Sequence, residues 1–275
     1  MIDEIEVHDL GFVKLLDIMG SDEEVENAAR ISYGEGTRKV SQTRNLIRYL
    51  MRHKHTSPFE MCEIKFHIKL PIFVMRQLVR HRTANLNEYS GRYSVMSNEF
   101  YLPEGDYLQK QSEVNRQGRG GVLEGKGIVH FEMNRIFDGA ATAYQTLLNN
   151  DLTRELARII LPVSNYTEVI WKIDLHNFFH IIKLRMDKHA QQEIQDYSKA
   201  MYEMVKPHFP SSCEAFEDYI NNSVTLSRME INALQHTLKC FPDAKSFLNN
   251  LKNSEDLQFG LGKREWTELK EKFNE

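Results

Sequence analysis

The sequence predicts an α+β fold, because several segments with helical periodicity are combined with few strand patterns. Apolar residues recur three and four positions apart in most of these segments. Near residue 65 they instead alternate with polar residues, which is typical of a strand. At 275 residues, the chain is long enough for one large domain, or for one domain with an extension.

Two helices are predicted in the first part of the chain. Residues 22–33 begin with acids and carry apolar positions at helical spacing, so this helix should start near Asp22. Residues 41–55 predict a second helix, with Ser41 as its N-terminal cap.

A strand and a helix should follow directly. From Cys62 to Leu70, apolar side chains alternate with charged ones, the pattern of a half-buried strand. Pro71 should end the strand and start a helix over residues 72–82, since proline fits the first helical turn.

The second half is predicted to be mainly helical after a loop. Residues 103–127 are rich in glycine, glutamine and charge, and indicate a long mobile loop or an insertion. Helical periodicity resumes over 128–150 and 151–161, and one long helix should run over 174–205. We expect a main domain at 1–220 and a helical C-terminal extension at 221–275.

Composition and charge narrow the functional classes. The net charge of −4 gives no overall attraction to nucleic acid, so any anion binding must come from a local basic cluster. Cys62, Cys213 and Cys240 are dispersed, which disfavours a disulfide framework and a cysteine zinc site. We expect a cytoplasmic protein without a signal peptide or a membrane-spanning segment.

The predicted helix from Asp174 has an apolar side that includes a cation. That side comprises Leu175, Phe178, Phe179, Ile182 and Met186, together with Arg185 and His189. A guanidinium there is costly unless a partner meets it, so Arg185 either forms an internal ion pair or awaits a ligand.

The opposite side of the same helix is polar. His176 and His180 lie one turn apart there, with Lys183 and Asp187. Histidines four residues apart can chelate a metal, but this spacer lacks the glutamate of an HExxH motif. A solvated polar face is the alternative interpretation.

The stretch RHRTANLNEYSGRYS, residues 80–94, is basic and follows the helix after Pro71. Gln77 and Arg80 should lie side by side on that helix and offer amide and guanidinium groups to one planar or anionic partner. Glu88 could orient Arg80 or Arg92, and Gly91 could let the backbone approach a ligand closely. A solvated basic loop would show the same composition.

These segments resemble the flavin-dependent thymidylate synthase (ThyX) family. In the family signature, RHR and a serine are separated by seven residues, as Arg80-His81-Arg82 and Ser90 are here. Further segments resemble family segments in the same order: AARISYG at 28–34, HTSPFE at 55–60, PIFVMRQLVRHR at 71–82, LARIILP at 156–162 and LRMDKHAQQEIQ at 184–195. So many ordered matches make chance an implausible explanation.

The resemblance implies both an activity and an assembly. The family reductively methylates dUMP to dTMP, with 5,10-methylenetetrahydrofolate as carbon donor, NADPH as reductant and FAD as the hydride relay. It implies a small, mostly antiparallel sheet flanked by long helices. It also implies a homotetramer with active sites at subunit interfaces.

The resemblance also implies site residues. For dUMP they are Gln77, Arg80, Glu88, Ser90, Gly91, Arg92, Arg158 and Arg185, of which Arg185 is the catalytic residue. For FAD they are His55, Ser57, Arg80, His81, Arg82, Glu88, Asp174, His176 and His180. Arginine forks and serine donors suit a phosphate, and a cation on an apolar stripe suits a developing pyrimidine anion.

One absence fits the chemistry of the family, and two residues depart from its pattern. None of the cysteines lies in the signature, which fits hydride chemistry without a cysteine nucleophile, and Ser90 is interpreted as a phosphate or substrate contact. Asn85 stands where the signature often has serine, and His180 stands where some members have asparagine.

Two other classes remain open. A nucleic-acid module would use Tyr89 and Tyr93 as stacking surfaces, and a metal-dependent hydrolase would use His176 and His180.

Overall fold

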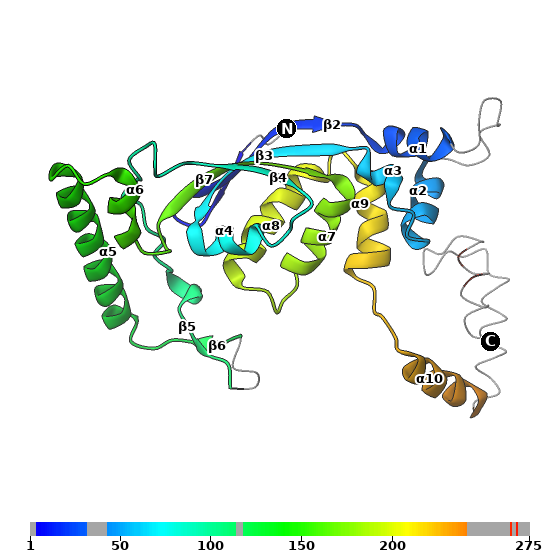
Figure 1. Ribbon diagram of the computed structural model, residues 1–275. Coiled ribbons are helices and arrows are strands. Elements are labelled where there is room, and N and C mark those ends of the chain that lie inside the picture. Colours follow the sequence, from blue (N-terminus) through cyan, green and yellow to red (C-terminus); the bar gives the residue numbers. More distant parts are fainter. Residues whose placement is uncertain (1–3, 32–42, 114–117, 241–264, 266–267, 269–275) are drawn as a thin grey trace. The chain divides into compact units, whose positions relative to one another are not determined.

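The computed structural model describes residues 4–31, 43–113, 118–240, 265 and 268 (Figure 1). Ser41, the predicted helix cap, lies outside the described residues. Contacts within the chain divide it into two units, Met1–Asn222 and Ser223–Glu275. The second unit contains helix α10 (Arg228–Cys240) among its described residues.

The first unit is built on one antiparallel sheet of five strands in the order β1-β2-β3-β7-β4. The strands are β1 (Glu4–Val7), β2 (Gly11–Met19), β3 (Glu63–Pro71), β7 (Tyr166–Asp174) and β4 (Asn85–Glu88). The α+β class and the small antiparallel sheet are therefore confirmed. The predicted strand from Cys62 is β3, while the other four strands were not predicted.

Helices α4 (Ile72–Leu78), α7 (Leu175–Arg185) and α8 (Gln192–Val205) cover one face of this sheet (Figure 1). The residues buried between sheet and helices include Ile64, Phe66, Ile68, Val169, Trp171, Phe178 and Phe179. Phe66 of β3 is paired with Trp171 of β7, so their side chains lie on the same, buried face of the sheet. As predicted, α4 begins directly after Pro71, which caps the helix in an extended conformation.

A group of helices packs at one end of the sheet. It comprises α1 (Asp22–Arg30), α2 (Thr43–Arg52), α3 (Ser57–Glu60), α9 (Pro210–Phe216) and the π-helix η4 (Glu217–Asn221). The prediction that a helix starts near Asp22 is confirmed. The buried Asp22 carboxylate accepts hydrogen bonds from the backbone N of Ser211 at 2.6 Å and of Ser212 at 3.0 Å. Asp22 thus satisfies free N–H groups at the start of α9.

The prediction of one long helix over 174–205 was wrong. Residues 166–174 form β7, α7 ends at Arg185, and α8 begins at Gln192. Asp187 lies between the helices, and its carboxylate accepts a hydrogen bond from the backbone N of His189 at 2.8 Å. This local turn competes with the helical hydrogen bonds and ends α7.

Residues 103–127, predicted to be a long mobile loop or an insertion, contain short regular elements in their described part. The segment contains η2 (Gly105–Tyr107) and a hairpin of β5 (Gln109–Gln111) and β6 (Arg119–Val122). Arg119 forms an ion pair at 2.5 Å with Glu193 of α8, which is only 2% exposed. The Tyr107 hydroxyl donates to Asp196 at 2.8 Å. These contacts hold η2 and the hairpin against α8.

The predicted helix over 128–150 is confirmed as α5 (Lys126–Asn149). The predicted helix over 151–161 is reduced to α6 (Arg154–Ala157) and the 3₁₀ turn η3 (Arg158–Ile160). Leu161 is extended because it precedes Pro162, and proline disfavours a helical residue before it. Within the described residues, no helix has the length and apolar character needed to cross a membrane.

Candidate functional site

A cavity of about 300 Å³ lies where the end of β4 meets the loop before β7. Its lining residues are Ile72, Glu88, Tyr89, Ser90, Gly91, Met96, Arg158, Leu161, Asn165 and Thr167. Four predicted dUMP-site residues, Glu88, Ser90, Gly91 and Arg158, are therefore brought together around one space. The cavity offers a carboxylate, a hydroxyl and a guanidinium to a ligand.

Gly91 allows Arg158 to approach this cavity. A Cβ atom at Gly91 would lie 3.0 Å from Cδ of Arg158 and 2.8 Å from Sδ of Met96. Contacts this short do not occur without displacement, so any larger residue would push one of these side chains away. Among the described residues Arg158 forms no ion pair, so its charge is available to an anion.

The predicted partners of Glu88 and Arg92 differ from those in the structure. Glu88 accepts a hydrogen bond from the Thr167 hydroxyl at 2.9 Å, rather than contacting Arg80 or Arg92. The Arg92 guanidinium is 3.2 Å from the carboxylate of Glu155, with both side chains more than half exposed. Arg92 therefore lies outside the cavity lining in this chain.

A second group of predicted residues is assembled at the end of α4 and α7. Nε of Arg185 donates to Nε2 of His81 at 2.9 Å, and its Nη2 lies 3.5 Å from the backbone O of Gln77. The ring of His81 also contacts that of His180, with centroids 6.0 Å apart and an interplanar angle of 73°. Gln77 donates a side-chain hydrogen bond to Gln191 at 2.6 Å.

The geometry of α4 corrects one prediction. The helix ends at Leu78, so Arg80 does not share it with Gln77; its backbone N instead donates to the Gln77 O at 3.3 Å in a turn. α4 carries Ile72, which lines the cavity, and Gln77, which belongs to the second group. The helix thus connects the two sets of predicted residues.

The pKa values of two side chains in the second group, His81 and Arg185, are lowered. Burial, followed by the nearby Arg185 and His180, lowers the pKa of His81 from 6.5 to about 4. Burial and then Arg80 lower the pKa of Arg185, which still remains a cation at neutral pH. Because Arg185 donates to Nε2, the neutral His81 ring carries its proton on Nδ1.

No acid pairs with Arg185 among the described residues, so the internal ion-pair interpretation is not met there. Its partners are a neutral ring and a backbone carbonyl. A half-buried cation of this kind favours an anionic or strongly polarised ligand.

A third group contains predicted flavin-site residues. His55 follows α2, with its ring centroid 5.9 Å from that of Tyr49, and Ser57 begins α3. The backbone N of Leu175 donates to the O of Cys62 at 2.9 Å, which joins the start of α7 to the residues after α3. Asp174 caps α7 by accepting from the backbone N of Asn177 at 2.8 Å.

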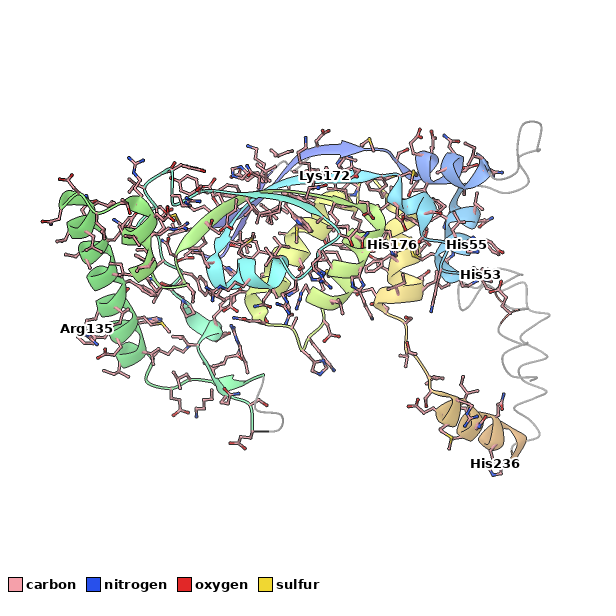
Figure 2. All side chains as sticks on the ribbon, in the orientation of Figure 1. His53, His55, Arg135, Lys172, His176 and His236 are labelled. Atoms are coloured by element: carbon pink, nitrogen blue, oxygen red, sulfur yellow. The ribbon has the colours of Figure 1, made fainter. Side chains whose placement is uncertain are left out.

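His176 lies half-buried in the first turn of α7, and Figure 2 shows it together with His53 and His55 beyond α2. In the described part of the chain, no group of three His, Cys, Asp or Glu residues is placed to hold a metal ion. The metal interpretation of His176 and His180 therefore lacks a third ligand there. Asn85 is exposed at the start of β4, opposite Lys172.

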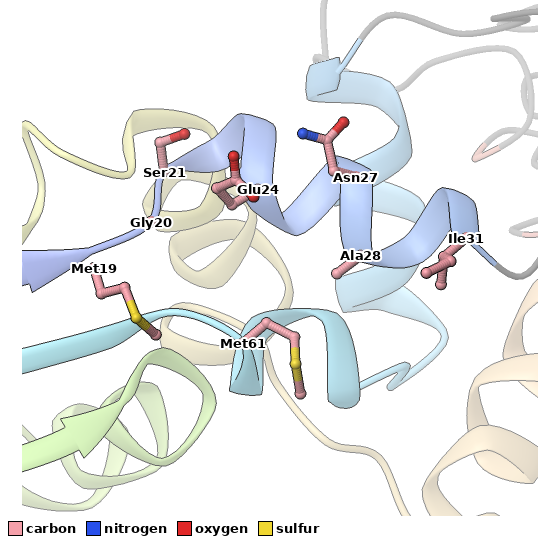
Figure 3. Close-up of a pocket in the computed structure, with 8 residues that line it drawn as sticks. All are labelled: Met19, Gly20, Ser21, Glu24, Asn27, Ala28, Ile31 and Met61. Carbon is pink, nitrogen blue, oxygen red and sulfur yellow. The ribbon is translucent and has the colours of Figure 1, made fainter.

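A second and larger hollow, of about 740 Å³, lies between α1 and the end of α3 (Figure 3). It is lined by Met19, Gly20, Ser21, Glu24, Asn27, Ala28, Ile31 and Met61. It contains none of the predicted site residues, and its one charged lining residue is an acid. The smaller cavity is therefore the better anion site despite its size.

Sequence reasoning missed several residues of the smaller cavity. Asn165 and Thr167 line it from the start of β7, and Met96 and Leu161 contribute apolar surface. The apolar, β-branched and aromatic residues Val169, Ile170, Trp171 and Ile173, bordered by Glu168 and Asp174, were the signal that could have revealed this strand. No sequence pattern indicated the hydrogen bond between Gln77 and Gln191.

Fold and site together define an α+β protein with a cavity lined by a carboxylate, a hydroxyl and a guanidinium, and with an arginine that donates a hydrogen bond to a neutral histidine. Residues 14–211 match the family model described as thymidylate synthase complementing protein, Thy1. A flavin-dependent thymidylate synthase from Ehrlichia ruminantium (strain Gardel) is 50% identical over 268 residues, covering 97% of this chain and 86% of the relative. One from Wolbachia pipientis wMel is 45% identical over 271 residues, covering 98% and 92%.

The structure is also similar to that of PolB, a UMP/dUMP methylase from Streptomyces cacaoi bound with 5-Br dUMP. The TM-score is 0.71 at 33% identity, covering 78% of this chain and 98% of PolB. The chain belongs to the Thy1 family, the thymidylate synthase complementing proteins. The resemblance inferred from the sequence motifs is thereby confirmed.

Proposed function

We propose that this chain is a flavin-dependent thymidylate synthase, which converts dUMP to dTMP with 5,10-methylenetetrahydrofolate and NADPH as co-substrates. The observation that carries the proposal is the cavity in which Glu88, Ser90, Gly91 and Arg158 meet, in a chain of this family. PolB, a relative of known structure, binds a dUMP analogue.

dUMP would bind in the cavity with its phosphate on the cationic side. The Arg158 guanidinium and the Ser90 hydroxyl can donate hydrogen bonds to the phosphate. Gly91, which has no side chain to crowd Met96 and Arg158, leaves space on that side. The Glu88 carboxylate can accept hydrogen bonds from sugar hydroxyls. Arg80, Arg92 and Gln77 complete the proposed set, with Arg92 turning from Glu155 to the ligand.

The residues of the second and third groups suit FAD. Arg80 and Arg82 form no ion pair with any acid in the described part of the chain, so two cations are left for the pyrophosphate. The remaining proposed contacts are His55, Ser57, His81, Glu88, Asp174, His176 and His180. Bound FAD would supply hydride transfer, which the side chains of this chain cannot perform.

Arg185 is the proposed catalytic residue. His81 and the Gln77 carbonyl hold its guanidinium in place without neutralising it. A fixed cation in a half-buried site stabilises negative charge that develops on the pyrimidine during the reaction. Because His81 is neutral and carries no negative charge, it does not weaken the positive potential of Arg185.

We propose a homotetramer with active sites at subunit interfaces. Three large apolar side chains of α5 support an oligomer: Ile128, Phe131 and Ile136 are 66%, 61% and 51% exposed in the single chain. Light scattering should give a mass of four chains, and a monomeric enzyme with full activity would contradict this assembly.

We also propose that residues 1–220 form the catalytic domain and 221–275 an extension. The family match over 14–211 supports the first range. The cytoplasmic compartment expected from the dispersed cysteines is part of the same proposal, and Cys62 and Cys213 are free thiols in the structure.

The test is a tritium-release assay with 5-tritiated dUMP. Purified protein given FAD, NADPH and methylenetetrahydrofolate should release tritium and form dTMP. A protein that stays colourless and inactive after FAD is added would contradict the proposal.

A further inference from the structure

Thr167 is a buried polar residue at the wall of the cavity. It lies on β7 and is only 3% exposed. A buried hydroxyl requires a hydrogen-bond partner, and here the partner is Oε1 of Glu88 at 2.9 Å. Thr167 of β7 thus holds the carboxylate of Glu88, a proposed dUMP contact at the end of β4.

The strand register explains this contact. Glu88 is the last residue of β4 and is paired with Val169 of β7, so both side chains point to the helix-covered face of the sheet. Thr167 lies two residues before Val169 and therefore faces the same side, diagonally across from Glu88. Thr167 is in turn paired with Leu70 of β3, which fixes its place on an inner strand of the sheet.

Glu88 has little else to hold it. β4 is an edge strand of four residues, all of them exposed. In the described structure Glu88 forms no ion pair, so the Thr167 hydroxyl is its side-chain anchor. This hydrogen bond occupies Oε1 and leaves Oε2 to accept a hydrogen bond from a ligand in the cavity.

We propose that Thr167 is a positioning residue, which orients the Glu88 carboxylate toward a hydroxyl-bearing ligand in the cavity. The inference rests on the proposed function, because the ligand is the nucleotide dUMP. It assigns to Thr167 a role in substrate affinity, exerted through Glu88, and no direct part in the chemical step.

The decisive variants are Thr167→Val and Thr167→Ser. Valine matches threonine in shape but lacks the hydroxyl, whereas serine keeps the donor and loses only a methyl group. For Thr167→Val we expect the KM for dUMP to rise about tenfold, while kcat falls less than about threefold. For Thr167→Ser the KM should stay within about twofold of the wild-type value.

A double-mutant cycle with Glu88→Gln links the effect to the carboxylate. Equilibrium titration with dUMP should show that Thr167→Val weakens binding in the wild-type background and adds little in the Glu88→Gln background. Equal losses in both backgrounds would show that Thr167 does not act through Glu88, and would overturn the inference.

Further outcomes also contradict it. A Thr167→Val enzyme with an unchanged KM overturns the inference, as does a Thr167→Ser enzyme that is as impaired as Thr167→Val. The wild-type protein is measured first in the same assays. If the wild type neither binds nor methylates dUMP, both the proposed function and the inference are refuted. If the wild type is active and Thr167→Val has an unchanged KM for dUMP, only the inference is refuted.

Discussion

Nε of Arg185 donates a hydrogen bond to Nε2 of His81 at 2.9 Å, so the cation at the end of α7 is held by a neutral ring. This pairing leaves the positive charge of Arg185 uncompensated. It also requires His81 to remain unprotonated, since a protonated ring has no lone pair to accept the bond.

Replacement of Arg185 should therefore abolish turnover without releasing the flavin. Arg185→Ala removes the proposed stabilisation of the pyrimidine anion, and we expect kcat to fall by about 100-fold or more. The flavin absorbance of the purified variant should stay close to that of the wild type. Arg185→Lys keeps the charge without the planar fork, so it should recover only part of the rate. Unchanged turnover in Arg185→Ala would remove Arg185 from the mechanism.

The low pKa of His81 makes protein stability depend on pH. Burial lowers this pKa from 6.5 to about 4, so between these values the unfolded chain binds a proton that the folded chain does not. The free energy of unfolding should thus decrease as the pH falls from about 6.5 to 4. Above that window His81 is neutral in both the folded and the unfolded chain, so it does not contribute to the pH dependence of stability.

His81→Gln is the matched variant, since an amide does not titrate and still offers an acceptor. Urea unfolding at several pH values should show a shallower loss of stability for His81→Gln than for the wild type. Parallel pH profiles would contradict the assigned pKa.

The sequence predicted the centre of the fold better than its edges. The alternation from Cys62 to Leu70 located β3, and the apolar stripe located the buried side of α7. The break between α7 and α8 escaped prediction, because both sides keep a helical pattern and the turn depends on one carboxylate, that of Asp187. The edge strand β4 escaped as well, since its four residues are exposed and pair only with β7.

Four residues of the cavity were among the predicted ones, but their arrangement was not predicted. The motifs supplied Glu88, Ser90 and Gly91 as neighbours in the chain, and Arg158 came only from the family resemblance. Its approach to Gly91 is a tertiary contact, which no local pattern encodes. The bond between Thr167 and Glu88 depends on the register of β4 against β7, which is likewise invisible in the sequence.

Gly91→Ala should weaken dUMP binding. The added Cβ would lie 2.8 Å from Sδ of Met96 and 3.0 Å from Cδ of Arg158, so the Met96 side chain must shift and the Arg158 side chain is crowded at the cavity. We expect the KM for dUMP to rise about tenfold, as for the loss of a charged hydrogen bond. Gly121→Ala is the control, because a Cβ there meets nothing within 4 Å. Equal kinetics in both variants would show that Gly91 is not required for space.

Arg119→Met should destabilise the protein. It leaves the carboxylate of Glu193, 2% exposed, without its cation, which costs about 3 kcal/mol in the free energy of unfolding. Arg135 lies on α5 (Figure 2) and forms an exposed ion pair with Glu132, so Arg135→Met should cost less than about 1 kcal/mol. Guanidinium unfolding of both variants checks the difference, and a loss for Arg119→Met no larger than that for Arg135→Met would contradict it.

The most direct test of the central claim is the absorption spectrum of the purified protein, recorded during a titration with dUMP. A flavoprotein that binds dUMP beside its flavin should show a flavin band that shifts and saturates as dUMP is added. The Arg185→Ala variant should keep the band and lose most of the dUMP-induced shift. A protein without a flavin band after reconstitution with FAD, or a band indifferent to saturating dUMP, would contradict the assignment of this site to dUMP and flavin together.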